Sequence, residues 1–243
     1  MKFFFLFLCL CNARADAPTP ASLLQSSDRA RGAALELKGL TWTSEVQSSE
    51  NGNRTDITYV VRVLGNDALA EVKDPPRQKG EAVLFNDRTL WFYKPGLKKP
   101  VNISPRQKLI GQAANGDIAS TQYARDYEAT SAGEDTVNGK KAWKLELKAK
   151  AKNVTYDKIR YWISKEDRVA LKAEFLTLGG ETFKIAEFLH GNFIRIKGTS
   201  YPFVSEMKIR DAIHSGNITT ITYKNPKEEA HRPGLFNVSS LTK

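Results

Sequence analysis

Apolar residues recur at every second position through most of this chain, and such alternation is typical of β-strands with one buried face. One predicted strand has on its apolar face Ile57, Tyr59, Val61 and Val63. Another alternates lysine and glutamate with Trp143, Leu145, Leu147 and Ala149. Turn signals such as Asn51-Gly52 and Asn138-Gly139 precede these runs. The pattern predicts a mainly β chain of antiparallel strands.

The stretch from residue 90 to 104 is unusual, because its first strand is apolar on both faces. The two faces carry Leu90 with Phe92 and Trp91 with Tyr93. A strand of this kind either is buried on both sides or faces a cavity on one. The Pro95-Gly96 pair after it predicts a type II turn, since glycine tolerates the positive φ of the third position.

Two segments depart from the alternation. Residues 20–30 predict one short helix, because Thr19 can cap it and Pro20 suits the first helical position. Residues 105–122 are small, polar and glycine-containing, and they predict short helices over an opening between two strand-rich halves. No linker or clear internal repeat is present, so residues 16–243 are predicted to form one domain.

The strand pattern bears on function because the arrangement of the strands determines whether the sheet encloses a cavity. A large single-layer sheet that curls must fill or cover its concave face. The predicted helical residues are too few to pack as a second layer, so an apolar, ligand-holding cavity is expected. A sandwich of two sheets with a closed, dry core fits the same strand pattern, and the pattern does not separate the two.

Residues 1–15 are predicted to be a cleaved signal peptide. Lys2 provides the positive start, residues 3–11 are apolar, and Ala13-Arg14-Ala15 is a small-x-small cleavage pattern. Cleavage removes both cysteines of the chain and lowers its net charge from +10 to +8. The mature chain is therefore predicted to be exported and free of thiols. Its basic charge favours anionic partners such as membrane surfaces.

The sequence carries no recognisable catalytic or metal-binding constellation. The three histidines, His190, His214 and His231, lie in different segments without metal-ligand spacing. A nucleophile elbow and a phosphate-binding glycine loop are also absent. No catalytic residue, metal or cofactor is expected, and the protein is predicted not to be an enzyme. Basic residues mostly alternate along strands as on a solvated face, so nucleic acid is not an expected partner.

Several blocks, taken in their order and spacing, carry a family resemblance. They are Leu90-Trp91-Phe92-Tyr93-Lys94-Pro95, Asn115-Gly116-Asp117-Ile118-Ala119-Ser120, Ala124-Arg125-Asp126-Tyr127-Glu128, Leu171-Lys172-Ala173-Glu174-Phe175 and Pro233-Gly234-Leu235-Phe236. Through them nearly all of the mature chain resembles the outer-membrane lipoprotein-sorting family, the LolA-like periplasmic carriers. The chain departs from the family at residues 115–118, where many members have a Gly-Ser-Asp-Phe type segment.

The resemblance implies an incomplete, strongly curved antiparallel β-barrel with short helices plugging the opening. It implies a periplasmic carrier that binds lipid or lipoprotein acyl chains in an apolar cavity and transfers them towards the outer membrane. The expected partners are a lipid or acylated lipoprotein, an inner-membrane lipid exporter and, transiently, an anionic membrane surface. Two alternatives stay open: a cargo-free accessory subunit of a lipid exporter, and a lipid-processing hydrolase.

Large apolar residues of the predicted strands are the candidates for the cavity wall, with Trp91 and Tyr93 first. The other candidates are Tyr59, Trp162, Phe175, Phe183 and Met207. Each is equally compatible with an ordinary core position. The lid candidates, in the segment over the opening, are Leu109, Ile110, Gly116, Asp117 and Ile118. Because few apolar residues anchor this segment, it is expected to open at modest cost.

Overall fold

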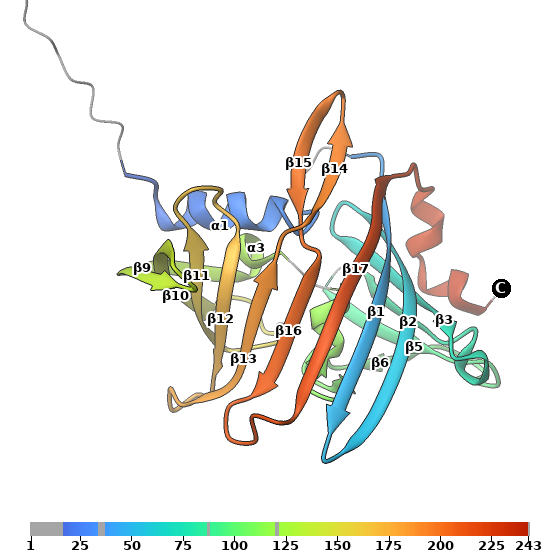
Figure 1. The fold of residues 1–243 in the computed structure, drawn as a ribbon. Helices are drawn as coiled ribbons and strands as arrows, with labels where there is room; N and C mark the ends of the chain where they lie inside the picture. The colour runs from blue at the N-terminus through green and yellow to red at the C-terminus, as the bar shows by residue number, and fades with distance from the viewer. Residues whose placement is uncertain (1–16, 34–36, 87, 120–121, 243) are drawn as a thin grey trace, which may run out of the picture.

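One antiparallel sheet of 13 strands curls around the interior of the molecule (Figure 1). The computed structural model describes residues 17–33, 37–86, 88–119 and 122–242, so the predicted signal peptide lies outside the described residues. Within the described part of the chain, no helix is long and apolar enough to cross a membrane. The predicted fold, a mainly β chain in a curved and unclosed antiparallel barrel, is confirmed.

The first half of the sheet is a meander in which each strand pairs with the next. Its strands are β1 (Leu40–Glu50), β2 (Asn53–Leu64), β3 (Asp67–Asp74), β4 (Ala82–Asn86), β5 (Thr89–Tyr93) and β6 (Val101–Ile103), with a single turn of 3₁₀-helix, η1 (Pro76–Gln78), after β3. The predicted hairpin at Asn51-Gly52 is confirmed, since both residues have the positive φ of a type I′ turn, 50° and 80°.

The second half begins at the opposite edge and runs back to the first. Its strands are β9 (Tyr127–Val137), β10 (Lys140–Ala149), β11 (Lys158–Ser164), β12 (Ala170–Leu176), β13 (Thr182–Leu189), β16 (Glu206–Asp211) and β17 (Ile218–Glu228). The last strand, β17, pairs with β1 and joins the two halves. The edges of the sheet are therefore β6 and β9, and the sheet does not close on itself.

One segment has to cross the open side of the barrel, because it links the two edges. We call residues 104–126 the crossing segment. It contains β7 (Lys108–Ile110), β8 (Ala113–Ala114), α2 (Asn115–Ala119) and α3 (Tyr123–Asp126). Figure 1 shows α2 inside the curve of the sheet. The short helices predicted for residues 105–122 are thus accompanied by a small hairpin.

The concave face of the sheet is apolar across its middle. Val46 of β1 lies opposite Ile57 on one side and Ile221 on the other, and the row continues through Met207 and Phe188. All five side chains are buried in one cluster. Because a slip of one residue would turn each strand's apolar set outward, this row fixes the register of five neighbouring strands.

Helix α1 (Pro20–Arg29) packs against α3 and β9 at one end of the barrel. The predicted helix is confirmed with its cap, since the Thr19 hydroxyl accepts a hydrogen bond from the Ser22 amide at 3.2 Å. A separate hairpin of β14 (Asn192–Ile196) and β15 (Thr199–Phe203) projects beyond the same end of the sheet (Figure 1).

The C-terminal residues cover the outer face of β3 to β5. They form η2 (Pro233–Phe236) and η3 (Val238–Thr242), and Phe236 is buried in a cluster with Leu84 of β4. Trp91 and Tyr93 of β5 pack against this outer cluster, while Leu90 and Phe92 pack in the inner one. Of the two surroundings predicted for β5, burial on both sides or a cavity on one, the partly buried Phe92 on its inner face favours the second.

Replacing Phe236 by alanine tests how firmly this C-terminal cover is held. Only 1% of the Phe236 surface is exposed, so Phe236→Ala should lower the free energy of unfolding by about 3–5 kcal/mol. Urea unfolding followed by tryptophan fluorescence measures the change, with Leu235→Ala, a partly buried neighbour, as the matched control. Equal, small losses in both variants would show that the segment is not part of the packed structure.

Candidate functional site

A cavity of about 540 Å³ lies between the inner faces of β2 to β6 and the crossing segment. We call it the lid cavity. Its apolar lining consists of Ile57, Tyr59, Val72, Ala82, Val83, Phe92, Ile103 and Leu109. Its polar lining consists of Gln78, Glu81, Gln107, Lys108 and Asn115. A volume of this size, lined by apolar and polar groups in similar measure, is within the range of small-molecule sites.

Each wall residue reaches the lid cavity through the alternation of its strand. Ile57 and Tyr59 are two apart on β2, and Phe92 and Ile103 come from the neighbouring strands β5 and β6. Leu109 comes from the crossing segment and closes the cavity from the other side. Desolvation raises the pKa of the Tyr59 hydroxyl above its usual range, with a smaller contribution from Glu81. Tyr59 is therefore neutral at physiological pH.

Polar contacts hold the crossing segment to both halves of the sheet. On one side, the Arg106 guanidinium donates two hydrogen bonds to the Asp157 carboxylate at 2.5 and 2.6 Å. On the same side, the Thr219 hydroxyl accepts from the backbone amide of Gln112 at 2.8 Å, and Lys184 donates to the Gln112 carbonyl at 2.7 Å. On the other side, Lys108 donates to Glu50 of β1 at 2.5 Å. These polar contacts act together with Ile110 and Ile118, which are buried in the inner cluster.

Two glycines let the crossing segment approach its neighbours closely. Gly111 has a φ of +53°, and a Cβ there would lie 1.8 Å from the Ser48 hydroxyl oxygen. A Cβ on Gly116 would lie 1.9 Å from the hydroxyl oxygen of Thr155. Any other residue would push the segment away from the barrel at either point.

Asp117 ties α2 to the barrel wall from inside. Its carboxylate accepts hydrogen bonds from the Ala114 amide at 2.8 Å and from the Tyr156 hydroxyl at 2.9 Å. Burial raises the pKa of Asp117, against the smaller lowering effects of Lys184 and these two donors. The Tyr156 ring stacks on Phe175 of β12 with ring centroids 3.7 Å apart. The crossing segment is therefore coupled to the aromatic core.

The predicted site residues separate into three environments. Tyr59 and Leu109 line the lid cavity. The inner cluster holds or contacts Phe175, Phe183, Met207, Ile110 and Ile118. Trp91 and Tyr93 do not line the lid cavity, because the pleat of β5 turns Leu90 and Phe92 inward and leaves these two rings under the C-terminal cover.

Trp162 also lies away from the inner cluster. It packs in a separate cluster with Ala142 and Leu171, and its indole NH donates to Asp135 at 2.8 Å. The ammonium group of Lys172 lies 4.5 Å from the centre of its ring. Its surroundings are polar and cationic, and they are not those of an acyl-chain wall.

Two buried charged residues, Asp28 and Arg31, were not among the predicted site residues. Asp28 accepts a hydrogen bond from the Ala124 amide at 2.7 Å, while its other carboxylate oxygen has no partner. Asp28 follows Leu24 by four residues and shares the buried face of α1, whereas Arg31 lies in the turn after the helix ends at Arg29. A charged residue on the apolar face of a short helix is the signal that could have singled out Asp28.

The three histidines lie in unrelated surroundings. His190 is largely buried and burial lowers its pKa to about 4, His214 is exposed beside Asp211, and His231 contacts Thr41. Among the described residues, no group of three histidine, cysteine or acidic side chains could hold a metal ion. None of the three histidines lines the lid cavity.

A model of a protein family described as "Uncharacterized protein" matches residues 65–243. No curated protein matches the sequence. A solved LolA superfamily protein from Nitrosomonas europaea is 26% identical, with 91% of this chain and 98% of that chain covered at a TM-score of 0.79. An outer membrane lipoprotein-sorting protein domain from Vibrio parahaemolyticus is 20% identical, with 92% and 98% covered at 0.77. A DUF1329 family protein from Desulfovibrio piger is 18% identical, with 92% and 100% covered at 0.75.

Asp28 should make stability depend on pH. Desolvation raises the pKa of its carboxyl to about 7, against the lowering effects of the Ala124 amide and Arg31. An unfolded aspartate titrates near pH 3.9, so the stability contributed by the protonated form is complete below about pH 4 and is lost as the pH rises through about 7. Relative to Asp28→Asn, the wild-type free energy of unfolding should fall over this window by up to about 4 kcal/mol.

Urea unfolding at several pH values between about 4 and 8 measures this difference. Asp157→Asn is the control with the opposite sign, because the hydrogen bond from Arg106 lowers the pKa of Asp157. The stability that ionised Asp157 contributes is present above the pKa of an unfolded aspartate and is lost as the pH falls through the lower pKa of the folded protein. Parallel stability profiles for the wild type and Asp28→Asn would contradict the assignment.

Proposed function

The chain belongs to the family whose model matches residues 65–243, a family with the fold of the LolA superfamily, and on this premise we propose that it is a periplasmic carrier of acyl chains. In this proposal the signal peptide is cleaved after Ala15. The mature chain binds a lipid, or the acyl chains of a lipoprotein, in the lid cavity and transfers them towards the outer membrane. It catalyses no reaction, and an inner-membrane lipid exporter loads it.

The physical need for such a carrier follows from the hydrophobic effect. Each CH₂ group left in water costs about 0.8 kcal/mol, so a chain of about 14 carbons costs on the order of 10 kcal/mol unless it is shielded. A carrier therefore needs an apolar cavity that excludes water and a cover that opens. The lid cavity, with its aliphatic and aromatic walls, supplies the first of these requirements.

The observation that carries the proposal is the way in which the crossing segment covers this cavity. Leu109 closes the apolar space, while the anchors Arg106 and Lys108 are partly exposed and paired with Asp157 and Glu50. Ion pairs at such positions exchange readily with water, because exposed pairs contribute only about 0–1 kcal/mol each. Full release of the segment also exposes Ile110 and Ile118, which are 7% and 2% exposed in this structure, so the ion pairs account for only part of the cost of opening.

A disulfide between α2 and the loop before β11 tests whether the crossing segment is the gate. A Cβ on residue 116 would lie 3.0 Å from the Thr155 Cβ, and a disulfide needs about 3.8 Å, so Gly116→Cys and Thr155→Cys can be joined once the two backbones move slightly apart. In the mature chain, which has no other cysteine, the oxidised double variant should take up and release a fluorescent fatty acid on the order of tenfold more slowly. Reduction should restore both rates.

Thr155→Cys alone is the matched control and should exchange the probe at the wild-type rate, and Gly116→Cys alone reports the effect of crowding against Thr155. Equal exchange with the disulfide closed would show that cargo does not pass the crossing segment. A protein that binds no apolar probe but associates with a lipid exporter would favour a cargo-free accessory subunit. Ester hydrolysis that is lost on replacing one serine or histidine would favour a lipid-processing hydrolase.

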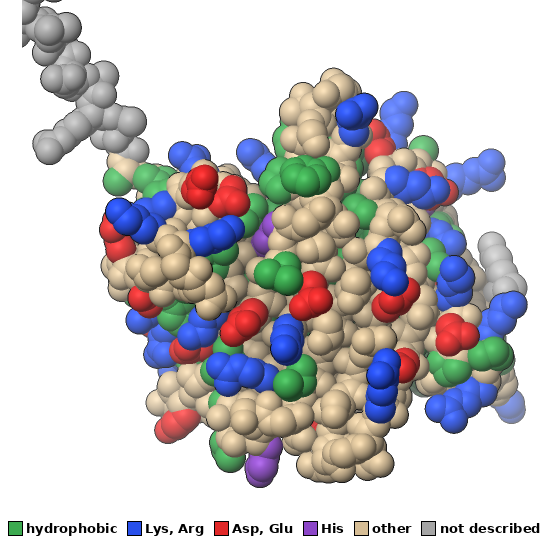
Figure 2. Space-filling view, in the orientation of Figure 1, with side chains coloured by type: hydrophobic (Ala, Val, Ile, Leu, Met, Phe, Trp, Pro, Cys, Tyr) green, Lys and Arg blue, Asp and Glu red, His purple; other side chains and the backbone are tan. Residues whose placement is uncertain are grey.

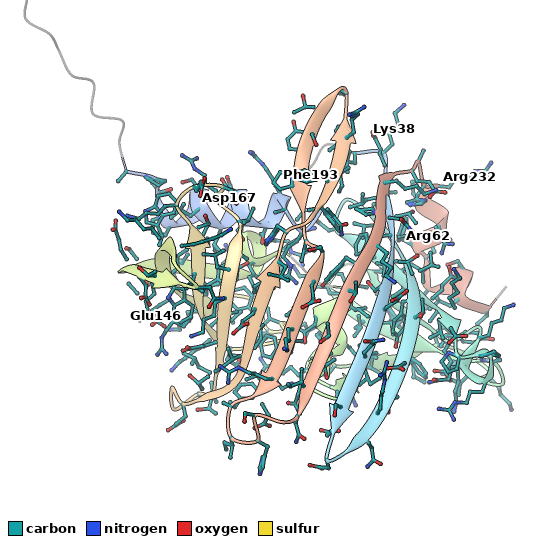
Figure 3. All side chains as sticks on the ribbon, in the orientation of Figure 1. Lys38, Arg62, Glu146, Asp167, Phe193 and Arg232 are labelled. Atoms are coloured by element: carbon teal, nitrogen blue, oxygen red, sulfur yellow. The ribbon has the colours of Figure 1, made fainter. Side chains whose placement is uncertain are left out.

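The projecting β14–β15 hairpin supports contact with an anionic membrane surface. Its outward face carries Phe193, which is 63% exposed, together with exposed Arg195 and Lys197. Figure 3 shows Phe193 on this hairpin, with Lys38 and Arg232 at the same end of the molecule. Figure 2 shows basic side chains around this end. An exposed ring between basic groups is typical of a surface that binds a lipid interface.

Replacing the two basic hairpin residues tests this contact. Each basic residue near an anionic surface contributes about 1 kcal/mol, so Arg195→Gln with Lys197→Gln should weaken binding to phosphatidylserine-containing vesicles about 10- to 30-fold. Vesicle co-sedimentation at low and high salt measures the effect, which should shrink as salt screens the charges. Lys148→Gln with Lys150→Gln removes the same charge elsewhere. If both double variants weaken binding equally, the hairpin has no special role.

A further inference from the structure

Arg31 is a buried cation whose hydrogen-bonding capacity is largely unused. It is 3% exposed, and its Nε and Nη1 atoms have no hydrogen-bond partner. The guanidinium lies over the rings of Tyr123 and Phe188, at 5.2 and 5.3 Å from their centres. Aromatic faces stabilise the charge but do not satisfy the N–H groups, and a buried unsatisfied donor is costly.

The buried carboxylates that interact electrostatically with Arg31 have other partners. Asp28 accepts its hydrogen bond from the Ala124 amide, and Asp117 accepts from the Ala114 amide and from Tyr156. Desolvation raises the pKa of both carboxyls, and that of Asp28 reaches about 7, so Asp28 loses part of its negative charge near neutral pH. Arg31 therefore stays incompletely neutralised in the interior.

A pocket connects the position of Arg31 to the end of the barrel. We call it the mouth pocket. It has a volume of about 430 Å³, and it is lined by residues that include Asp28, Leu37, Leu40, Val63 and Arg125. A narrow extension of about 20 Å³ borders Arg31 and shares Leu40, Val63 and Arg125 with the larger space. The donors of Arg31 therefore border a space that holds about one water molecule, and the side chains beside it must move before an acidic group in the mouth pocket reaches them.

Further donors face the same interior. The Tyr223 hydroxyl is buried without a hydrogen-bond partner. Burial raises the pKa of Tyr223, and nearby Arg31 opposes the shift, so this hydroxyl keeps its proton and can donate it. The unpartnered oxygen of Asp28 is a third potential donor when protonated. Neutral donors around a guanidinium form a site for an anion, because all of them can point at one acceptor group.

We infer that the mouth pocket binds the acidic group, a carboxylate or a phosphate, of an anionic amphiphile, with Arg31 as its principal partner. The inference rests on the proposed carrier function and specifies the cargo. Helix α2 lies between the two spaces, since Ile118 borders the extension beside Arg31 and Asn115 borders the lid cavity. Displacement of α2 joins them, so the acidic group sits at Arg31 and the acyl chain runs towards the lid cavity.

The experiment compares ligands that share one chain and differ in charge. Palmitate, hexadecyl phosphate and hexadecanol each compete against a bound apolar fluorophore on the mature protein. The two acids should bind at least about tenfold more tightly than the alcohol, as expected for charge-assisted hydrogen bonds in a buried site. Arg31→Gln should remove this preference and leave hexadecanol binding unchanged. Arg62→Gln, an arginine paired with Glu71 outside the pocket, is the control and should keep the preference.

A second variant covers the case in which Arg31→Gln does not fold. Tyr223→Phe removes only the unpartnered hydroxyl. It should weaken binding of the two acids about threefold without changing the binding of hexadecanol. Palmitate labelled with ¹³C at the carboxyl supplies a readout on the unmodified protein. Its bound carboxyl should titrate at a lower pH than the free acid, because an adjacent guanidinium favours the charged form.

Equal binding of acids and alcohol by the wild type, or a preference kept in Arg31→Gln, would overturn the inference while leaving the carrier function intact. If inorganic phosphate binds as tightly as hexadecyl phosphate, the acyl chain contributes nothing to binding. That result would overturn the assignment of an amphiphile as the ligand and indicate a site for the free anion. Binding of none of the three long-chain ligands would overturn the carrier function itself. These outcomes separate the failure of the inference from the failure of the proposal on which it rests.

Discussion

The path of the chain between the two edges of the sheet constrains the rest of the structure. The first half of the sheet ends at one edge and the second half begins at the other, so the crossing segment must pass over the open side of the barrel. A backbone in that position has to satisfy its polar groups against the barrel. The Gln112 amide donates to Thr219 and its carbonyl accepts from Lys184, while within the segment the Ala114 amide donates to Asp117. The cover is thus a consequence of topology, and the small polar residues make it fit.

The interior combines an apolar middle with polar ends. The buried row through Val46 and Met207 forms the floor, and the crossing segment divides the space above it into the lid cavity and the mouth pocket. Buried polar groups in such a place are costly unless something satisfies them. Asp117 is satisfied within the fold, whereas Arg31 keeps free donors. That asymmetry suits a ligand with one charged end and a long apolar body.

The sequence predicted those features that depend on local periodicity. The strand through Tyr59, the Thr19 cap and the Asn51-Gly52 hairpin follow from neighbouring residues, and the structure confirms them. The residues of β5 alone do not show which face of the strand points inward, because both faces are apolar. Strand pairing and the C-terminal cover determine it. Buried charges such as Arg31 escaped notice for a related reason: their burial depends on distant aromatic residues.

Lipid analysis of the native protein tests the central claim most directly. The protein is purified from its native host without detergent, and the lipids extracted from it are identified and counted by mass spectrometry. The account predicts about one acyl lipid per protein molecule, because a carrier cavity in water retains its cargo. That lipid should carry an acidic group. Lipid no more abundant than in an unrelated periplasmic protein purified in the same way would contradict the account.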